Sequence, residues 1–247
     1  MGLFKKQITW RTPEGRYYNI SNEALTAEHT LIAGTTGCGK TTFVRSIMQA
    51  ALVQHSPAEA QFILIDPKRF ELIAYKDLPH TIGYANDAEQ ALEALKHASR
   101  IMEQRSRELE RSRRTKYEGA DLYVVIDELN DLMISRLAGP IRQVMEHIIT
   151  LGRAMRVHII ACTQAPNRHN IPASIVSCYT CRFGLKTMHG IESRQIVGVS
   201  GCELLPKHGE TIAAIDGQLG RHKLPYVTEA DINPLLRYWT SKACIVR

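Results

Sequence analysis

The segment GTTGCGKT at residues 34–41 constrains the fold of this chain more than any other feature. It follows a short apolar run at residues 30–33, which we expect to be a buried strand. The residues after it carry apolar side chains with the 3.6-residue period of an amphipathic helix: Phe43, Val44, Ile47, Met48, Ala51 and Leu52. A glycine-rich loop between a strand and a helix is the Walker A pattern, in which backbone N–H groups and the helix N-terminus surround a phosphate. The alternative is a glycine-rich turn that matches by chance, and the strand–loop–helix context argues against it.

Each residue of this loop is a candidate contact for a bound nucleotide. Lys40 is expected to reach the β- and γ-phosphates, and the hydroxyl of Thr41 is expected to ligate Mg²⁺. The predicted cofactors are therefore ATP and Mg²⁺. The candidate nucleotide-binding residues are Gly34, Thr35, Thr36, Gly37, Cys38, Gly39, Lys40, Thr41 and Thr42.

Two further segments place polar residues directly after apolar runs. Residues 123–128 read YVVIDE, so Asp127 is expected to hold the Mg²⁺ shell and Glu128 to act as the base for an attacking water. The alternative is a helix-capping Asp followed by a surface Glu. Gln164 follows the run VHIIAC and is a candidate for γ-phosphate sensing or water alignment, the alternative being an ordinary turn after a strand. Together these motifs predict a nucleoside-triphosphate hydrolase with Lys40, Asp127, Glu128 and Gln164 in its catalytic site.

Strand and helix patterns alternate along the rest of the chain. We expect further strands at residues 62–65, 157–162 and 179–185, and helices at 87–116 and 141–155. This alternation predicts an α/β fold with a mainly parallel central sheet flanked by helices. The expected division is a β-hairpin extension at 1–24, a main domain at 25–224 and a C-terminal tail at 225–247.

Composition excludes several classes of protein. No apolar run approaches the roughly 20 residues of a membrane-spanning helix, and the N-terminal segment lacks the apolar run typical of a signal peptide, so we expect a soluble cytoplasmic protein. The formal net charge of +6 fits a polyanion partner without proving one. Cys178 and Cys181, with Cys202 and His208, could be read as a zinc site, but we favour buried structural thiols.

Five segments resemble the FtsK/SpoIIIE family of DNA translocases. They are residues 29–42, 62–75, 124–133, 152–175 and 181–198, and the second contains the family's IDPK and EL residues: Asp66, Pro67, Lys68, Glu71 and Leu72. The resemblance spans about residues 25–215. Cys38 stands where this family usually has a small residue, so we expect thiol reagents to affect activity.

The resemblance implies a RecA-like P-loop motor that assembles as a ring, a homo-hexamer, around double-stranded DNA. ATP would bind at subunit borders, where an arginine of the neighbouring subunit stabilises the transferred phosphoryl group. Arg153, Arg182 and Arg194 compete for that role; we favour Arg153 and Arg194, although each could instead be an ion-pair or surface residue. Residues 167–173 and 130–142 are the candidate DNA-facing loops, and the charged segment at 100–116 is either a solvated helix face or a DNA- or subunit-facing one.

Three other functions share parts of this pattern. A type VII secretion-like protein-export ATPase has the same core, usually as tandem domains behind membrane helices. A conjugation coupling protein moves DNA together with a relaxase, and a regulatory module would bind nucleotide without hydrolysing it. Membrane helices, the long linker and the winged-helix module of larger family members are not recognised here. The sequence therefore resembles a minimal motor from a plasmid, conjugative element or phage, or a trimmed chain, with any membrane or relaxase partner encoded elsewhere.

Overall fold

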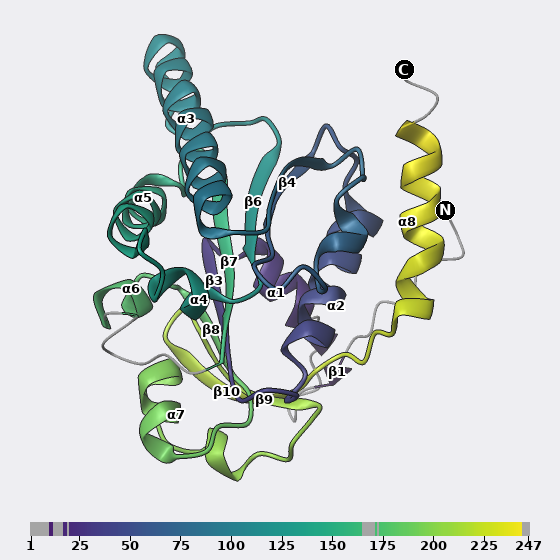
Figure 1. The fold of residues 1–247 in the computed structure, drawn as a ribbon, viewed down its shortest axis with the longest axis vertical. Coiled ribbons are helices and arrows are strands. Elements are labelled where there is room, and N and C mark those ends of the chain that lie inside the picture. The colour runs from purple at the N-terminus through teal and green to yellow at the C-terminus, as the bar shows by residue number, and fades with distance from the viewer. Residues whose placement is uncertain (1–9, 12–16, 19, 165–170, 172, 244–247) are drawn as a thin grey trace.

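An eight-stranded, mainly parallel sheet forms the centre of the molecule (Figure 1). The computed structural model describes residues 10–11, 17–18, 20–164, 171 and 173–243. The strands of the sheet are β3 (His29–Ala33), β4 (Ala60–Ile65), β5 (Thr81–Ala85), β6 (Asp121–Ile126), β7 (Val157–Thr163), β8 (Cys181–Gly184), β9 (Glu210–Ile215) and β10 (Gln218–Lys223). Their order is β10-β9-β8-β3-β7-β6-β4-β5, in which β8–β9 and β9–β10 pair antiparallel and the other neighbours pair parallel.

Helices cover both faces of this sheet (Figure 1). One face carries α1 (Ile20–Thr26), α2 (Lys40–Gln54) and α8 (Glu229–Ala243). The other carries α3 (Ala88–Ser112), α4 (Leu129–Met133), α5 (Ala138–Leu151) and α6 (Ala173–Ser177). The remaining helical elements are η1 (Ile73–Tyr75), α7 (Gly190–Val197) and η2 (Cys202–Leu204). The predicted α/β class and mainly parallel sheet are confirmed.

The central strands are apolar on both sides because both of their faces are covered. In β6, Tyr123 and Val125 pack into the core under α2, whereas Leu122, Val124 and Ile126 pack into the core under α3 and α5. Successive strand side chains point to opposite faces, so one continuous apolar run serves two cores. Phe43 of α2 packs in the first core against Phe183 of β8, with the two rings edge to face and their centroids 4.9 Å apart.

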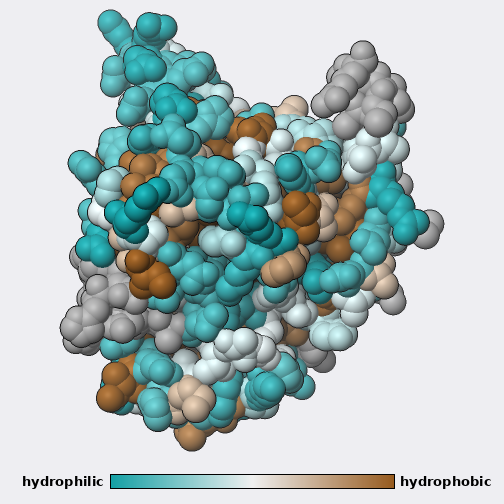
Figure 2. Space-filling view, in the orientation of Figure 1, coloured by the Kyte–Doolittle hydropathy of each residue, from teal (hydrophilic) through white to brown (hydrophobic). Residues whose placement is uncertain are grey.

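Helix α3 is shorter than the sequence pattern predicts. Asp87 caps its N-terminus by accepting a hydrogen bond from the Gln90 N–H at 2.8 Å, and the helix ends at Ser112, followed by Arg113 with a left-handed φ of 54°. Figure 2 shows that its free end is hydrophilic, as the charged sequence indicates. Arg105 departs from that surface role: it is 5% exposed and donates to the carbonyl oxygens of Met155 and Arg156.

Several elements were not predicted from the sequence. These are α1, β5, α4, α6, α7, the β9–β10 hairpin and α8. The segment beyond residue 225, expected to be a tail, forms α8, which packs against α2 through a hydrogen bond from the Trp239 indole to the Leu52 carbonyl at 2.9 Å. Near the N-terminus, β1 (Trp10–Arg11) pairs antiparallel with β2 (Tyr17–Tyr18). Within the described residues, no helix has the length and apolar character needed to cross a bilayer.

Candidate functional site

Four parallel strands deliver the candidate residues to one edge of the sheet. Strands β3, β4, β6 and β7 are neighbours or near neighbours, and their carboxyl ends lie on the same side. The loop at 34–39 follows β3, Lys68 follows β4, Asp127 and Glu128 follow β6, and Gln164 follows β7. The crevice beyond the carboxyl ends of the strands is where open α/β sheets bind ligands.

Backbone conformation shapes the loop at 34–39 into an open cradle. Gly37 and Gly39 have φ values of 73° and 106°, a region that side-chain-bearing residues avoid. The ammonium of Lys40 folds over the loop and donates to the carbonyl oxygens of Gly34 and Thr35, at 2.7 and 3.1 Å. The loop then passes into the N-terminus of α2, whose unpaired N–H groups and dipole favour an anion.

The loop is attached to a strand on either side. Gly34 N–H donates to the Thr163 carbonyl of β7 at 3.2 Å, and Thr35 N–H donates to the Lys186 carbonyl after β8 at 2.8 Å. Gly34 is confined so closely that an added Cβ would lie 2.9 Å from both the Cys38 sulfur and Leu185 Cβ. Glycine is therefore required here because a larger residue has no space.

A cavity of about 590 Å³ opens above this loop. The predicted residues that line it are Thr36, Gly37, Gly39, Lys40, Thr41, Thr42, Asp127 and Gln164. Cys38 does not line it: the side chain is 1% exposed, and burial raises the pKa of its thiol. A buried, protonated thiol reacts slowly, so this geometry argues against the expected sensitivity to thiol reagents.

Asp127 fits the expected magnesium role. It is 8% exposed, and its Oδ2 atom is buried without a hydrogen-bond partner among the described residues. Burial raises its pKa to about 6; Lys68 opposes the rise, and the nearby carboxylates Glu71, Asp66 and Glu128 add to it. A carboxylate held in this way gains from a cation, and oxygen donors such as Asp127 and the Thr41 hydroxyl are what Mg²⁺ prefers.

Glu128 is buried rather than on the surface, so the alternative of a surface Glu was wrong. It is 1% exposed and both of its oxygens are engaged. Oε2 lies 3.1 Å from the ammonium of Lys68, and Oε1 accepts the Gln164 N–H at 3.2 Å. The Gln164 side chain in turn accepts a hydrogen bond from the Thr36 hydroxyl at 3.0 Å. One chain of contacts thus connects the loops after β4, β6 and β7 with the phosphate loop.

The candidate arginines lie away from this pocket. Arg153 is at the opposite edge of the sheet, where its exposed guanidinium lies 2.6 Å from Glu28 at the start of β3. Arg194, on α7, is exposed and bonds the Ser200 hydroxyl, and Arg182 lies in β8. None of the three lines the cavity of their own chain. Residues 167–170 and 172 of the predicted pore loop fall outside the described residues.

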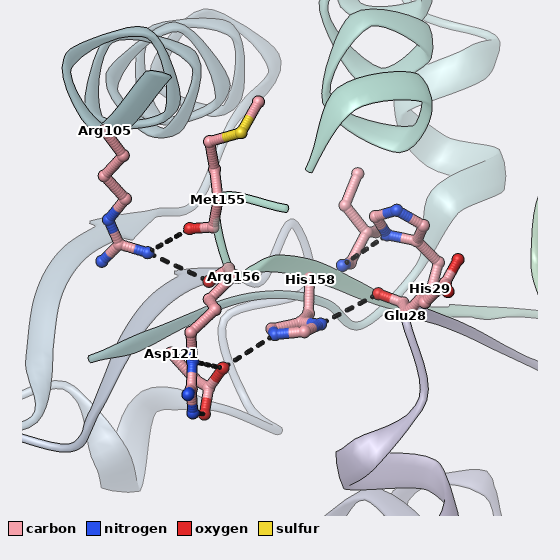
Figure 3. Close-up of polar contacts among 8 residues, drawn as sticks. Glu28, His29, Arg105, Asp121, Met155, Arg156 and His158 are labelled. Atoms are coloured by element: carbon pink, nitrogen blue, oxygen red, sulfur yellow. Dashed lines mark hydrogen bonds and ion pairs between the residues drawn. The ribbon is translucent and has the colours of Figure 1, made fainter. Parts of the chain in front are cut away.

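A second polar cluster occupies the amino edge of the same strands (Figure 3). Asp121, the first residue of β6, accepts a hydrogen bond from Arg156 Nε at 2.7 Å and is hydrogen-bonded to His158 Nε2 at 3.0 Å. The other ring nitrogen of His158 faces the Glu28 carbonyl at 3.1 Å, and the ring stacks on Tyr123. Although burial opposes it, the hydrogen bonds and charges of His158 and Arg156 lower the pKa of Asp121 to about 2.

Sequence reasoning missed part of the main pocket. The additional lining residues are Lys68, Glu71, His208, Gly209, Leu224, Pro225 and Tyr226. Lys68 and Glu71 belong to the IDPK segment, which marked the family resemblance without suggesting a role. Of the cysteines considered for zinc, Cys178 is exposed while Cys181 and Cys202 are buried, and the described residues hold no cluster of three metal-binding side chains.

The fold and this site together define a P-loop NTPase of RecA-like architecture. The Walker A loop follows β3, the acidic pair follows β6, and β7 lies between them with its polar residue at the same edge. The sequence model of the FtsK/SpoIIIE family matches residues 13–197, and the chain belongs to this family.

Relatives and solved structures agree with this assignment. The chain is 33% identical to the DNA translocase FtsK of Chlorobaculum tepidum, over 89% of this chain and 31% of that protein. It is 30% identical to that of Tropheryma whipplei, over 88% and 32%. The chain therefore spans about a third of the length of these relatives.

Two solved structures share the fold at lower identity. The cytoplasmic domain of the type VII secretion ATPase EccC of Thermomonospora curvata is 22% identical, with a TM-score of 0.75 over 94% of this chain and 30% of that one. The pCW3 conjugation coupling protein TcpA is 18% identical, with a TM-score of 0.73 over 91% and 67%.

Proposed function

We propose that this protein is an ATP-dependent double-stranded DNA translocase. The observation that carries the proposal is that Lys40 and Asp127 line one cavity, with Glu128 buried next to it against the cavity residue Lys68, in a chain of the FtsK/SpoIIIE family. The relatives at about 30% identity are DNA translocases by name, which supports DNA as the substrate that is moved. The net charge of +6 is compatible with a polyanion.

Each pocket residue has a defined task in hydrolysis. Lys40 and the loop N–H groups would bind the β- and γ-phosphates, while Thr41 and Asp127 would hold Mg²⁺, which would neutralise charge on the phosphate oxygens. Glu128 accepts the proton of the attacking water, whose oxygen then bonds to the γ-phosphorus as ADP leaves. Gln164, hydrogen-bonded to Thr36, is placed to report whether the γ-phosphate is present.

The working assembly that we propose is a hexameric ring with ATP at subunit borders. Arg153 projects from the edge of the sheet opposite its own phosphate loop, so it is suited to serve a neighbour rather than its own chain. Arg194 is the second candidate. Arg153→Ala and Arg194→Ala should be compared at concentrations that permit assembly: the variant lacking the trans arginine should lose roughly 10³-fold in hydrolysis and keep its affinity for ATP.

Other expectations from the sequence complete the proposal. DNA would be contacted through its phosphates, without base readout, by the segments at 167–173 and 130–142, the second of which comprises most of α4 and the start of α5. The functional unit is the main domain at 25–224, with the hairpin at 1–24 and the segment at 225–247 as extensions. The proposed setting is the cytoplasm, in plasmid or conjugative DNA transfer or in DNA segregation, with a membrane or relaxase partner encoded separately.

The test is ATP hydrolysis with and without long double-stranded DNA at low salt. We expect strong stimulation by DNA and its loss in Glu128→Gln, because Gln cannot take up the proton; a positioned base contributes roughly 10²–10⁴-fold. If Glu128→Gln abolishes hydrolysis but DNA does not change its rate, the result would contradict the proposal that the protein moves DNA. The proposal that it hydrolyses ATP would be retained.

That second outcome would favour a protein-export ATPase. The structural similarity to the EccC cytoplasmic domain, with a TM-score of 0.75, is the observation behind this alternative. An export ATPase should respond to an extended peptide substrate rather than to DNA, so the same assay with each ligand separates the two functions.

A further inference from the structure

Lys68 and Glu128 form an ion pair that the sequence does not suggest, because they lie far apart in the chain. The ammonium is 3.1 Å from Glu128 Oε2, and the side chains are 38% and 1% exposed. The other carboxylate oxygen of Glu128 accepts the Gln164 backbone N–H. Each oxygen thus already accepts one hydrogen bond, and the Lys68 ammonium competes with an attacking water for Glu128.

Of the two contacts of Glu128, the one with Lys68 can be broken by a movement of the lysine side chain alone. The Gln164 N–H belongs to the backbone at the end of β7, whereas Lys68 is a long side chain that lines the nucleotide cavity. The backbone of the loop that carries Lys68 is held by Asp66, whose side chain is fully buried. This carboxylate accepts hydrogen bonds from the backbone N–H groups of Arg69, Glu71 and Leu72 at 2.9, 3.1 and 3.0 Å. The loop is thus held firmly while the ammonium can move within the cavity.

We propose that Lys68 is a positioning residue that holds Glu128 until ATP binds and then moves to the γ-phosphate, freeing Glu128 to act as the base. The inference rests on the proposed ATP hydrolysis and names Lys68, in addition to Gln164, as a group that responds to the third phosphate. ADP lacks the competing anion, so the Lys68–Glu128 pair remains formed with ADP. Glu128 is then paired with Lys68 when ADP is bound and released from Lys68 when ATP is bound.

Charges around Lys68 support its role as a mobile cation. Although partial burial lowers its pKa, the carboxylates of Glu128, Asp127 and Asp131 raise it overall, so the group remains an ammonium. A triphosphate brings more negative charge into the cavity than Glu128 alone supplies. The exchange gives the ammonium a new anionic partner, while the buried Glu128 carboxylate keeps only its bond from the Gln164 N–H and gains from taking up a proton.

Equilibrium binding of Mg-AMPPNP and Mg-ADP, without DNA, tests the proposal in four variants. In Glu128→Gln, AMPPNP binding no longer requires an ion pair to break, so its affinity relative to ADP should rise roughly tenfold, about 1.4 kcal/mol. In Lys68→Ala that preference should fall roughly tenfold below the unmodified protein, and in Lys68→Arg it should be largely retained. The double variant should match Lys68→Ala.

The control is Lys96→Ala, which removes another Lys–Glu pair, that with Glu93 at 2.8 Å on the surface of α3, and should leave both affinities unchanged. Thermal unfolding verifies that each variant folds, and Lys68→Gln replaces Lys68→Ala if that variant does not. The proposal is overturned if the AMPPNP gain of Glu128→Gln persists in the Lys68→Ala background, or if Lys68→Ala leaves the AMPPNP-to-ADP preference intact. Because DNA is absent, neither result bears on whether the motor moves DNA.

Discussion

Strand β6 carries an aspartate at each end, and the two are treated in opposite ways. Asp121 begins the strand at the amino edge, where Arg156 and His158 hold it and its pKa is lowered to about 2. Asp127 follows the strand at the pocket edge, where burial raises its pKa to about 6. Its Oδ2 atom has no hydrogen-bond partner among the residues that the structure describes. The charge of an aspartate is therefore compensated by neighbouring groups at one edge of the sheet and poorly compensated at the other.

The difference separates stability from function. A carboxylate whose charge is compensated within the protein contributes to folding, whereas one that lacks compensation costs folding free energy and gains from a ligand cation. The amino edge behaves as a structural clamp, whereas the pocket edge holds a buried carboxylate whose charge is poorly compensated. Substitutions at the two ends should accordingly have different signatures.

The largest expected effect is on activity at the pocket edge. Asp127→Asn should lower ATP hydrolysis by about 100-fold or more, since metal charge stabilisation contributes several kcal/mol to the barrier. In EDTA near pH 7, the same variant should unfold with a free energy about 1–2 kcal/mol higher than the unmodified protein, because its neutral amide carries no buried charge. Denaturant unfolding at a constant m-value measures this, and a large loss of stability would break the comparison.

The next largest effect is on stability at the amino edge. Asp121→Asn should lower the free energy of unfolding by about 3 kcal/mol, because Arg156 and His158 lose a largely buried partner. Affinity for Mg-ADP should stay within about twofold, since the site lies at the other edge. A variant that unfolds normally but fails to bind nucleotide would show that the two edges are coupled.

A smaller effect appears in the pH dependence. The folded pKa of Asp121 is lowered, so its contribution is present above pH 4 and is lost as pH falls from about 4 to about 2. The stability difference between the unmodified protein and Asp121→Asn should therefore shrink by roughly 2 kcal/mol over that window. For Asp127 the sign reverses: its folded pKa is raised, so the advantage of Asp127→Asn should grow as pH rises from about 4 to about 6. Unfolding titrations at several pH values follow both differences.

The smallest effect is expected at the exposed rim of the amino edge. Arg153 is 79% exposed in its pair with Glu28, so Arg153→Ala should change the free energy of unfolding by less than about 0.5 kcal/mol. Thermal unfolding of the unassembled chain measures this. A loss near that of Asp121→Asn would place Arg153 within the clamp instead of at its surface.

Much of the pocket could be predicted because its residues follow strong local patterns. Lys40 and Asp127 each come directly after or near an apolar run, and strands of one parallel sheet bring their carboxyl ends together. The pairing of Lys68 with Glu128 could not be predicted, since it depends on which loops become neighbours across β4 and β6. Arg105 was misjudged for a related reason: its sequence neighbours are charged and solvated, but it reaches two loop carbonyls.

The missed elements have weak or mixed patterns. In β5 at the sheet edge, Ile82 is 37% exposed and Gly83 has no side chain, so the usual apolar run is absent. β10 forms the other edge and is largely exposed, with a charged and polar sequence. Helix α8 contains Pro234, which usually argues against a helix interior. Edge strands and a proline-containing helix need the tertiary contacts that only the folded chain supplies.

The attachment of the phosphate loop to two strands has a mechanical consequence. The Gly34 N–H is bonded to β7 and the Thr35 N–H to the segment after β8, so the positions of these two residues depend on the ends of both strands. A displacement of one strand end relative to the other, caused by a neighbouring molecule or a moving substrate, would therefore change the geometry of the phosphate loop.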